Sequence, residues 1–192
     1  MTVAERVIQL LRETGALLEG HFALTSGLHS TRYVQCARIL QYPQHAETFG
    51  QWIAPSFHDH AIDAVASPAI GGLIIGHEVA RALGVRAIFG EREGGVMTLR
   101  RGFTIAPHER VLVVEDVTTT GGSVREIVHL VQAQHGIVVG VGTILDRSGG
   151  RIDFGVPWHT LATLEIDNYA PEACPLCQQG SQAVKPGSRQ HA

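Results

Sequence analysis

Apolar residues along the chain follow two kinds of pattern, which alternate from one end to the other. Apolar positions three and four residues apart predict helices at 2–14, 44–57, 73–83 and 124–134. Short continuous apolar runs, rich in β-branched residues, predict buried strands at 61–66, 85–90, 111–114, 137–145 and 160–166. Strands that alternate with helices are typical of an α/β fold, with a parallel sheet flanked by helices.

Three further segments have weaker patterns. Residues 25–30 predict a turn and residues 33–40 a strand. Residues 91–103 carry charged and threonine positions between glycines, a pattern typical of a mobile hairpin flap. Residues 168–192 form an irregular tail, and we expect the last six of them to be disordered.

Composition limits the class of protein. With 192 residues and 44% hydrophobic content, the chain can bury one substantial core, and we expect a single domain over 1–192. It contains no apolar run long enough to cross a membrane, and its start lacks the pattern of a signal peptide, so we expect a cytoplasmic protein. The net charge of -3 argues against a nucleic-acid partner. All but one of the 15 basic residues are arginines, so any cationic catalysis must rest mainly on arginine.

The richest chemistry lies at residues 111–123, where the predicted strand meets two acids, Glu115 and Asp116. Hydroxyls and glycines follow, and their backbone amides precede a predicted helix whose positive end would attract a phosphate. The stretch lacks the lysine of a P-loop and the G-x-G-x-x-G of a dinucleotide site. Adjacent carboxylates beside a phosphate loop indicate a sugar phosphate, with its hydroxyls on the acids. The alternative is a plain strand-to-helix turn with an incidental acidic pair.

This stretch resembles the phosphoribosyl-diphosphate (PRPP) signature of the type I phosphoribosyltransferases. The resemblance implies their fold, with a small N-terminal hood mainly at 15–40, a core at about 45–167 and the tail at 168–192. It also implies PRPP as a substrate, Mg²⁺ carried by PRPP rather than by direct protein ligands, and a homodimer. The implied PRPP-binding residues are Arg92, Glu115, Asp116, Val117, Thr118, Thr119, Thr120, Gly121, Gly122 and Ser123.

Two other segments resemble the orotate branch of that family. The F-x-L-x-SG-x-x-S pattern before an aromatic strand is matched by Phe22, Leu24, Ser26, Gly27, Ser30 and Tyr33. The L-D-R motif is matched at Arg147, which the resemblance implies grips the orotate carboxylate, and Thr119 matches a base-contacting position. The implied reaction joins the phosphoribosyl group of PRPP to orotate, with Glu115, Asp116 and Arg92 as the catalytic residues. A surface ion pair between Arg147 and Asp146 is the alternative for that arginine.

The chain departs from the family pattern at three places where lysines are usual. Thr25 stands before the Ser-Gly pair, Ile70 and Gly71 stand in the loop that should hold pyrophosphate, and the flap has neither Lys nor His. We therefore assign the leaving-group role to a flap arginine, with Arg92 preferred over Arg100 and Arg101. A purine phosphoribosyltransferase and a non-catalytic PRPP sensor remain alternatives, although the sensor should carry a basic surface or an added domain.

The remaining candidate ligands carry less information. Cys36 alternates with apolar neighbours, which predicts a small core residue. The His58-Asp59-His60 triplet has no third ligand nearby and predicts a surface feature. Cys174 and Cys177 form a C-x-x-C pair, which is half of a zinc site and needs two more ligands. We expect a reduced thiol pair there in preference to a metal, with the choice between thiols, a disulfide and zinc left open.

Overall fold

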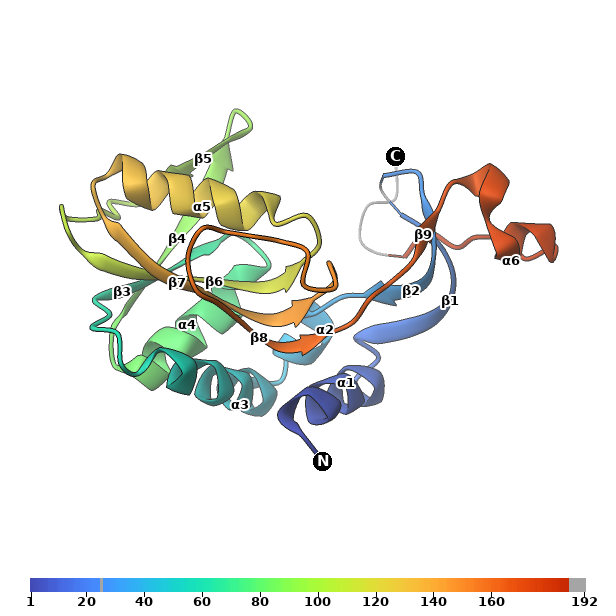
Figure 1. The fold of residues 1–192 in the computed structure, drawn as a ribbon, viewed down its shortest axis with the longest axis horizontal. Coiled ribbons are helices and arrows are strands. Elements are labelled where there is room, and N and C mark those ends of the chain that lie inside the picture. The colour runs from blue at the N-terminus through green and yellow to red at the C-terminus, as the bar shows by residue number, and fades with distance from the viewer. Residues whose placement is uncertain (25, 187–192) are drawn as a thin grey trace.

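A central sheet and a smaller hood sheet organise the molecule (Figure 1), which is described by a computed structural model over residues 1–24 and 26–186. Within those residues the central sheet has six strands. In spatial order they are β5 (Val96–Leu99), β4 (Arg86–Glu93), β3 (Ala64–Pro68), β6 (Arg110–Thr118), β7 (Ile137–Asp146) and β8 (Trp158–Thr163). All neighbouring pairs are parallel except β4 and β5, which form the antiparallel hairpin predicted at 91–103.

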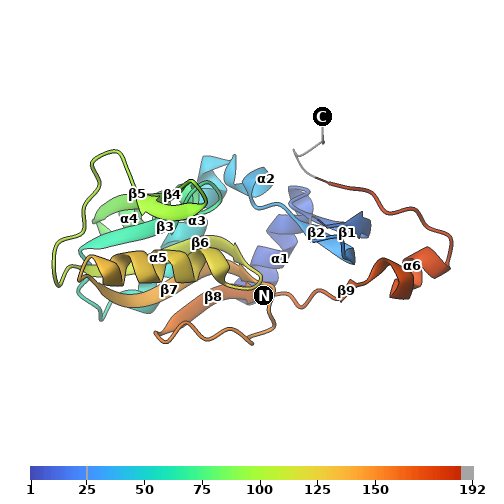
Figure 2. The same ribbon diagram turned by 90° about the horizontal axis from the view of Figure 1, so that it is seen from above.

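Helices cover both faces of the central sheet. Helix α5 (Gly122–Ala133) lies on one face, and α3 (Pro43–Ile53) and α4 (Gly72–Leu83) lie on the other (Figures 1 and 2). The apolar run 111–114 in β6 is buried on both faces of the sheet. Val111 and Val113 pack on the α5 side, while Leu112 and Val114 pack on the α3 and α4 side. The predicted α/β class and the flanking helices are confirmed.

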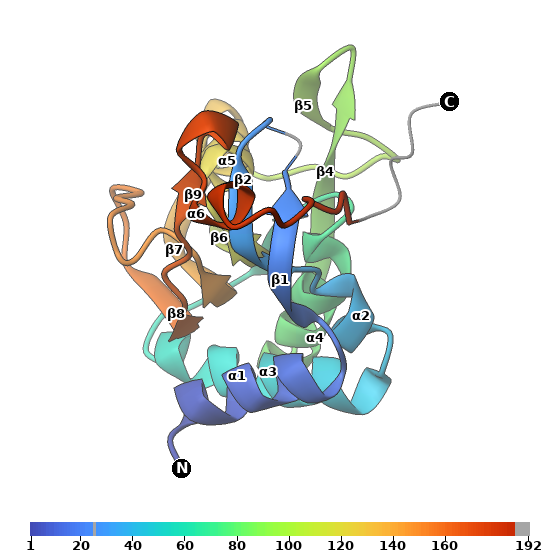
Figure 3. The ribbon, with the colours of Figure 1, turned by 90° about the vertical axis from the view of Figure 1, so that its right-hand side faces the viewer.

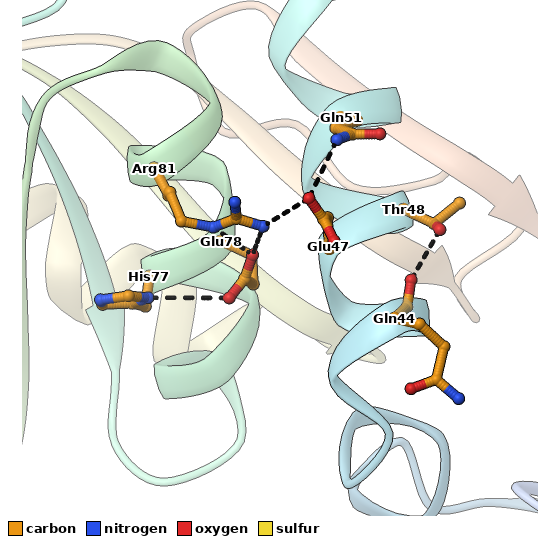
Figure 4. A network of polar contacts seen from close by, with 7 residues as sticks. All are labelled: Gln44, Glu47, Thr48, Gln51, His77, Glu78 and Arg81. Carbon is orange, nitrogen blue, oxygen red and sulfur yellow. Dashed lines mark hydrogen bonds and ion pairs between the residues drawn. The ribbon is translucent and has the colours of Figure 1, made fainter.

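Helices α3 and α4 pack closely at Gly50 of α3. A Cβ built on Gly50 would lie 2.8 Å from the backbone of Glu78, so a larger residue there would push the two helices apart. On the outer edge of this contact, Arg81 bonds Glu78 on its own helix and Glu47 on α3 (Figure 4). Arg81 is exposed and Glu47 is half-exposed, so water screens these ion pairs, and the buried glycine contact fixes the helix pair.

The hood lies beyond one end of the central sheet (Figures 1 and 3). Strands β1 (Leu17–Ala23) and β2 (His29–Val34) form an antiparallel hairpin, and β9 (Asn168–Tyr169) adds to β2. Helix α1 (Val3–Glu13) begins at a capping box between Thr2 and Glu5 and contacts β8, and α2 (Ala37–Leu40) leads into α3. The other short elements are the 3-10 helices η1 (Ala54–Phe57) and η2 (Pro171–Ala173) and helix α6 (Pro175–Gln178).

Several predicted boundaries were wrong. The strand predicted at 33–40 ends at Val34, and α2 replaces its second half, because Ile39 and Leu40 are both buried and no longer alternate. The strand predicted at 61–66 runs over Ala64–Pro68, and the one at 160–166 over Trp158–Thr163. The predictions for Thr25 and for the last six residues, 187–192, lie outside the described residues. No helix within the described residues is long and apolar enough to cross a membrane.

Candidate active site

The acidic pair lies within β6, near its carboxyl end. The strand continues to Thr118, four residues beyond the predicted end, so both acids have regular strand geometry. Glu115 is 7% exposed, and its Oε1 accepts a hydrogen bond from the Asp116 amide at 3.1 Å. Asp116 Oδ1 accepts one from the Val117 amide at 2.8 Å. The two carboxylates are therefore held in place by the backbone before any ligand binds.

Burial controls the ionisation of this pair. Removal from water, and after it the charge of Asp116, raises the pKa of Glu115 to about 9. Burial also raises the pKa of Asp116. A ligand that brings hydroxyl donors or a cation to this edge of the sheet would favour the charged carboxylates, so the pair is suited to a ribose diol.

The predicted phosphate loop joins β6 to α5. Gly121 has a φ of +75°, which glycine adopts without strain, and a Cβ there would lie 2.8 Å from the Phe154 ring. Helix α5 starts at the next residue, so its free amides face the loop. The loop therefore has the backbone shape that the sequence predicted for an anion site.

Arg125 fixes this loop from the first turn of α5. Its Nη1 donates to the Thr120 carbonyl at 2.6 Å, and its Nη2 donates to the Asp153 carbonyl at 3.1 Å. Its guanidinium carbon lies 5.5 Å from the centre of the Phe154 ring. Sequence reasoning missed this residue, because nothing in the local pattern shows that residues 153 and 154 return to the loop.

A cavity of about 220 Å³ lies over the loop and the acids. Its lining includes every predicted PRPP-binding residue except Asp116 and adds Val124, which was not predicted. The lining residues are Arg92, Glu115, Val117, Thr118, Thr119, Thr120, Gly121, Gly122, Ser123 and Val124. Backbone amides that could donate to a phosphate, one carboxylate and one arginine thus line the same cavity.

The three flap arginines differ in position. Arg92 on β4 lines the cavity, and its Nη2 lies 2.5 Å from a carboxylate oxygen of Glu126. Arg101 forms a two-pronged contact with Glu91, and Arg100 lies 3.5 Å from Glu93. Both of these pairs belong to the hairpin, so Arg92 is the flap arginine already directed at the site.

A second loop reaches the same acids. The segment between β3 and α4 passes so close that a Cβ on Gly71 would lie 2.8 Å from Asp116 Oδ1. A Cβ on Gly72 would lie 3.1 Å from Glu115 Oε1. The glycines thus allow backbone to approach the carboxylates, and the two predicted strand-loop-helix units meet at one site.

Arg147 follows β7 on the opposite side of the acids from β3. The Asp146 carboxylate does not pair with it, because that carboxylate accepts hydrogen bonds from the amides of Ser148 and Gly150 at 2.6 and 2.7 Å. Across the described residues Arg147 has no acidic partner within 4.0 Å. The surface ion pair with Asp146 is therefore wrong as an interpretation of this arginine.

Unpartnered polar atoms gather where β6 and β7 end. Arg147 Nε, Thr118 Oγ1 and Ser148 Oγ are buried without a hydrogen-bond partner among the described residues. Burial lowers the pKa of Arg147, and the nearby Tyr33 and Cys36 of the hood oppose that shift. Buried polar groups normally have partners, so these three atoms mark the place where a polar ligand would supply them.

Cys36 connects the hood to this site. It is 1% exposed, as its core prediction requires, and burial followed by the charges of Asp116 and Glu115 raises the pKa of its thiol. The charges show that the hood reaches the acidic pair. A buried thiol with a raised pKa is a poor nucleophile, so Cys36 serves as packing.

Comparison with known proteins identifies the family. A model of the phosphoribosyl transferase domain matches residues 37–176. The curated orotate phosphoribosyltransferase of Pelotomaculum thermopropionicum is 56% identical over 185 residues, which cover 96% of this chain and 97% of the relative. The chain belongs to the orotate phosphoribosyltransferase family. The Thermotoga maritima orotate phosphoribosyltransferase is 52% identical over 181 residues, which cover 94% of this chain and 97% of that one.

The fold of a solved orotate phosphoribosyltransferase agrees with this assignment. The crystal structure from Aeropyrum pernix is 26% identical, covers 82% of this chain and 93% of that one, and has a TM-score of 0.69. The resemblance inferred from residues 111–123, from the Ser-Gly segment and from Arg147 is therefore confirmed at the level of the family. The roles of individual residues in this chain stay predictions.

Proposed function

We propose that this protein transfers the phosphoribosyl group of PRPP to a ring nitrogen of orotate and releases orotidine 5'-phosphate and pyrophosphate, a step toward UMP. One observation carries the proposal. Buried Glu115, an amide-rich loop at a helix start and Arg92 line a single cavity, and Asp116 lies next to Glu115 on the same strand. Arg147, which has no acidic partner within the described part of the chain, follows the neighbouring strand. Family membership supports the reaction, and this arrangement supports the proposed position of each part of the substrates.

The chemistry requires stabilisation of charge more than a protein nucleophile. As pyrophosphate leaves, positive charge spreads over the ribose ring oxygen and the anomeric carbon, and the orotate nitrogen then bonds to that carbon. Glu115 and Asp116 hold the ribose hydroxyls, and the amides from Thr118 to Ser123 hold the 5'-phosphate. Arg92 stabilises the departing pyrophosphate, and the hairpin at 91–103 limits access of water to the reactive carbon.

Orotate lies between the ends of β6 and β7 in this proposal. Its carboxylate pairs with Arg147, whose planar guanidinium suits a two-pronged contact, and Thr119 contacts the ring. The unpartnered atoms of Thr118, Arg147 and Ser148 support this placement, because a ring with carbonyl and imide groups can satisfy them. Thr119 is exposed on the loop, where a bound base can reach it.

Mg²⁺ is the expected cofactor and would be held chiefly by PRPP. The residues present fit this ion, because the carboxylate oxygens of Glu115 and Asp116 are hard donors and a cation beside them would offset their mutual repulsion. Bound Mg²⁺ would supply neutralisation of the pyrophosphate charge.

A homodimer and a cytoplasmic location complete the proposal. Ile70 lies in the loop expected to hold pyrophosphate and is 84% exposed, and Ile74 lies in the first turn of α4 and is 44% exposed. A second subunit could cover both. The free thiols of Cys36, Cys174 and Cys177 suit a reducing compartment. Sedimentation velocity of the purified enzyme tests the dimer, and a monomer at all concentrations would contradict it.

The activity test is an absorbance assay of orotate consumption that depends on PRPP and Mg²⁺, repeated with a panel of purine bases in place of orotate. Turnover of orotate alone supports the proposal. Turnover of a purine alone would favour a purine phosphoribosyltransferase, and no turnover of any base would favour a PRPP sensor.

The arginine test separates the two substrates. Arg147→Ala should raise the KM for orotate at least about tenfold, since it removes a charge-assisted pair to a carboxylate, and should change the KM for PRPP far less. Arg151→Ala is the matched control, because Arg151 is exposed and pairs only with Glu165 within the described part of the chain. Equal effects of Arg147→Ala on both substrates would count against the assignment.

A further inference from the structure

Two histidines of the hood and two cysteines of the tail meet in one place. His21 lies on β1 and His29 at the start of β2. Cys174 directly precedes α6, and Cys177 lies within it. One ligand atom from each residue lies within 4.8 Å of all the others. The tail, coloured red in Figure 1, runs beside the hood hairpin and away from the central sheet. This cluster is separate from the cavity over the acidic pair, whose lining shares none of its residues.

The distances are close to those of a tetrahedral metal site. His21 Nε2 lies 2.9 Å from His29 Nδ1, 3.4 Å from Cys174 Sγ and 3.7 Å from Cys177 Sγ. Cys177 Sγ lies 3.2 Å from His29 Nδ1. In a zinc tetrahedron with two nitrogen and two sulfur ligands, the ligand atoms are roughly 3.3 to 3.8 Å apart. The two distances below this range both involve His29 Nδ1, so an outward shift of His29 would lengthen both.

The neighbouring groups orient the ligands as well. His21 Nδ1 lies 3.2 Å from Ser181 Oγ, which leaves Nε2 free to face the cluster. The β1–β2 register shifts by one residue between Glu19 and Phe22, and this bulge is where His21 leaves the regular pattern. Both features direct the His21 ring to the tail.

Few other contacts hold the tail within the described residues. Over residues 171–186 the one buried side chain is that of Cys174, so no apolar core holds this segment. Its two helices have three and four residues, which is too short to be stable alone. Backbone bonds between Val184 and the His21–Ala23 stretch lie at its far end. A bound ion at the cysteines would hold the near end.

We propose that His21, His29, Cys174 and Cys177 bind one structural zinc ion that fastens the tail to the hood hairpin. Two thiolates and two imidazoles are the ligands zinc prefers, and four protein ligands leave no open position for catalysis. In this proposal zinc takes the place of the expected reduced thiol pair, since the two ligands that the C-x-x-C pair lacked come from the same chain.

The main test measures the metal in untagged full-length enzyme, purified without added metal and without chelator. Elemental analysis should find about one zinc per chain, and a mercurial that blocks thiols should release it to a colorimetric indicator. Cys174→Ser and His29→Ala should each lose most of the zinc. His58→Ala is the matched control, because His58 is an exposed histidine outside the cluster, and it should keep the zinc.

Two measurements on the unmutated enzyme keep the test decisive if a variant fails to fold. Replacement of the ion by Co²⁺ should give the visible bands of tetrahedral cobalt and a thiolate charge-transfer band. Chelation should open residues 171–186 to cleavage by a glutamate-specific protease at Glu172. Metal-free enzyme that also gives no tetrahedral cobalt spectrum would overturn the proposal. So would zinc retained by both variants, or a disulfide between Cys174 and Cys177 in the purified enzyme.

Discussion

Replacement of Arg125 tests whether the phosphate loop is prearranged by its own helix. Arg125→Ala removes two charged hydrogen bonds, one to the Thr120 carbonyl and one to the Asp153 carbonyl, together with the contact over the Phe154 ring. A hydrogen bond from a charged donor contributes about 1.5 to 3 kcal/mol where it is buried. Because Arg125 is only half-buried and water can solvate the freed carbonyls, we expect a net loss of about 1 to 2 kcal/mol.

That loss should be seen in PRPP binding. If the loop must be ordered again by the substrate, kcat/KM for PRPP should fall about 5- to 30-fold, since 1.4 kcal/mol corresponds to a factor of ten. The KM for orotate should change less than the KM for PRPP, because Arg147 and its strand are untouched and Thr119 is the one residue of the loop assigned to the base. For Arg125→Lys, kcat/KM for PRPP should lie between the wild-type and Arg125→Ala values, since a single ammonium reaches one carbonyl and not both.

Steady-state kinetics with each substrate varied in turn, together with thermal unfolding, provide the assay. Arg81→Ala is the matched control, because Arg81 is also a helical arginine but bonds surface glutamates on α3 and α4 (Figure 4). It should leave both KM values unchanged. Wild-type kcat/KM for PRPP in a well-folded Arg125→Ala enzyme would refute the reasoning, and so would an equal loss for both substrates.

Two further predictions concern stability. Gly76→Ala should lower the melting temperature although alanine favours helix, because the new Cβ would lie 2.1 Å from Ser67 Oγ and 2.9 Å from Ser67 Cβ. Adding Ser67→Ala should restore part of the lost stability. No restoration would show that another contact is responsible. The second rests on the pKa of Glu115, which burial raises from its ordinary value of 4.5 to about 9 in the folded enzyme. The contribution of protonated Glu115 to the stability of the folded state is therefore complete below pH 4.5 and is lost as pH rises through 9. Glu115→Gln lacks that titration, so in substrate-free enzyme its melting temperature relative to wild type should rise between pH 5 and pH 9, and a constant difference in a pH series of melting curves would contradict the pKa shift.

Local patterns were enough to predict most of the central sheet. A strand buried on both faces must be apolar at every position, so β6 and β7 could be recognised without knowledge of their neighbours. The β4–β5 hairpin followed from its paired glycines, Gly94 and Gly95, both of which have positive φ. These features depend on residues adjacent in the sequence, which explains why they could be predicted.

The wrong predictions arise where distant segments decide the structure. The segment after Val34 was predicted to remain extended, but the chain must turn there from the hood into α3, and α2 makes that turn with Ile39 and Leu40 in the core. The phosphate loop itself was predicted, whereas its support by Arg125 depends on residues 153 and 154. Sequence spacing carries no signal for such a contact.

The proposed zinc cluster is the extreme case, because its two halves lie about 150 residues apart and neither half is a complete motif. Its place in the fold gives it a consequence at the active site. Strand β2 starts at His29 in the cluster and passes through Tyr33, which lies near Arg147. Four residues of extended strand span roughly 13 Å, so one stiff segment joins the cluster to the orotate side of the site. The phosphate loop is attached to α5 instead. An ion that fixes the outer end of the hairpin would therefore position the hood over orotate while leaving the PRPP loop to Arg125 and its helix.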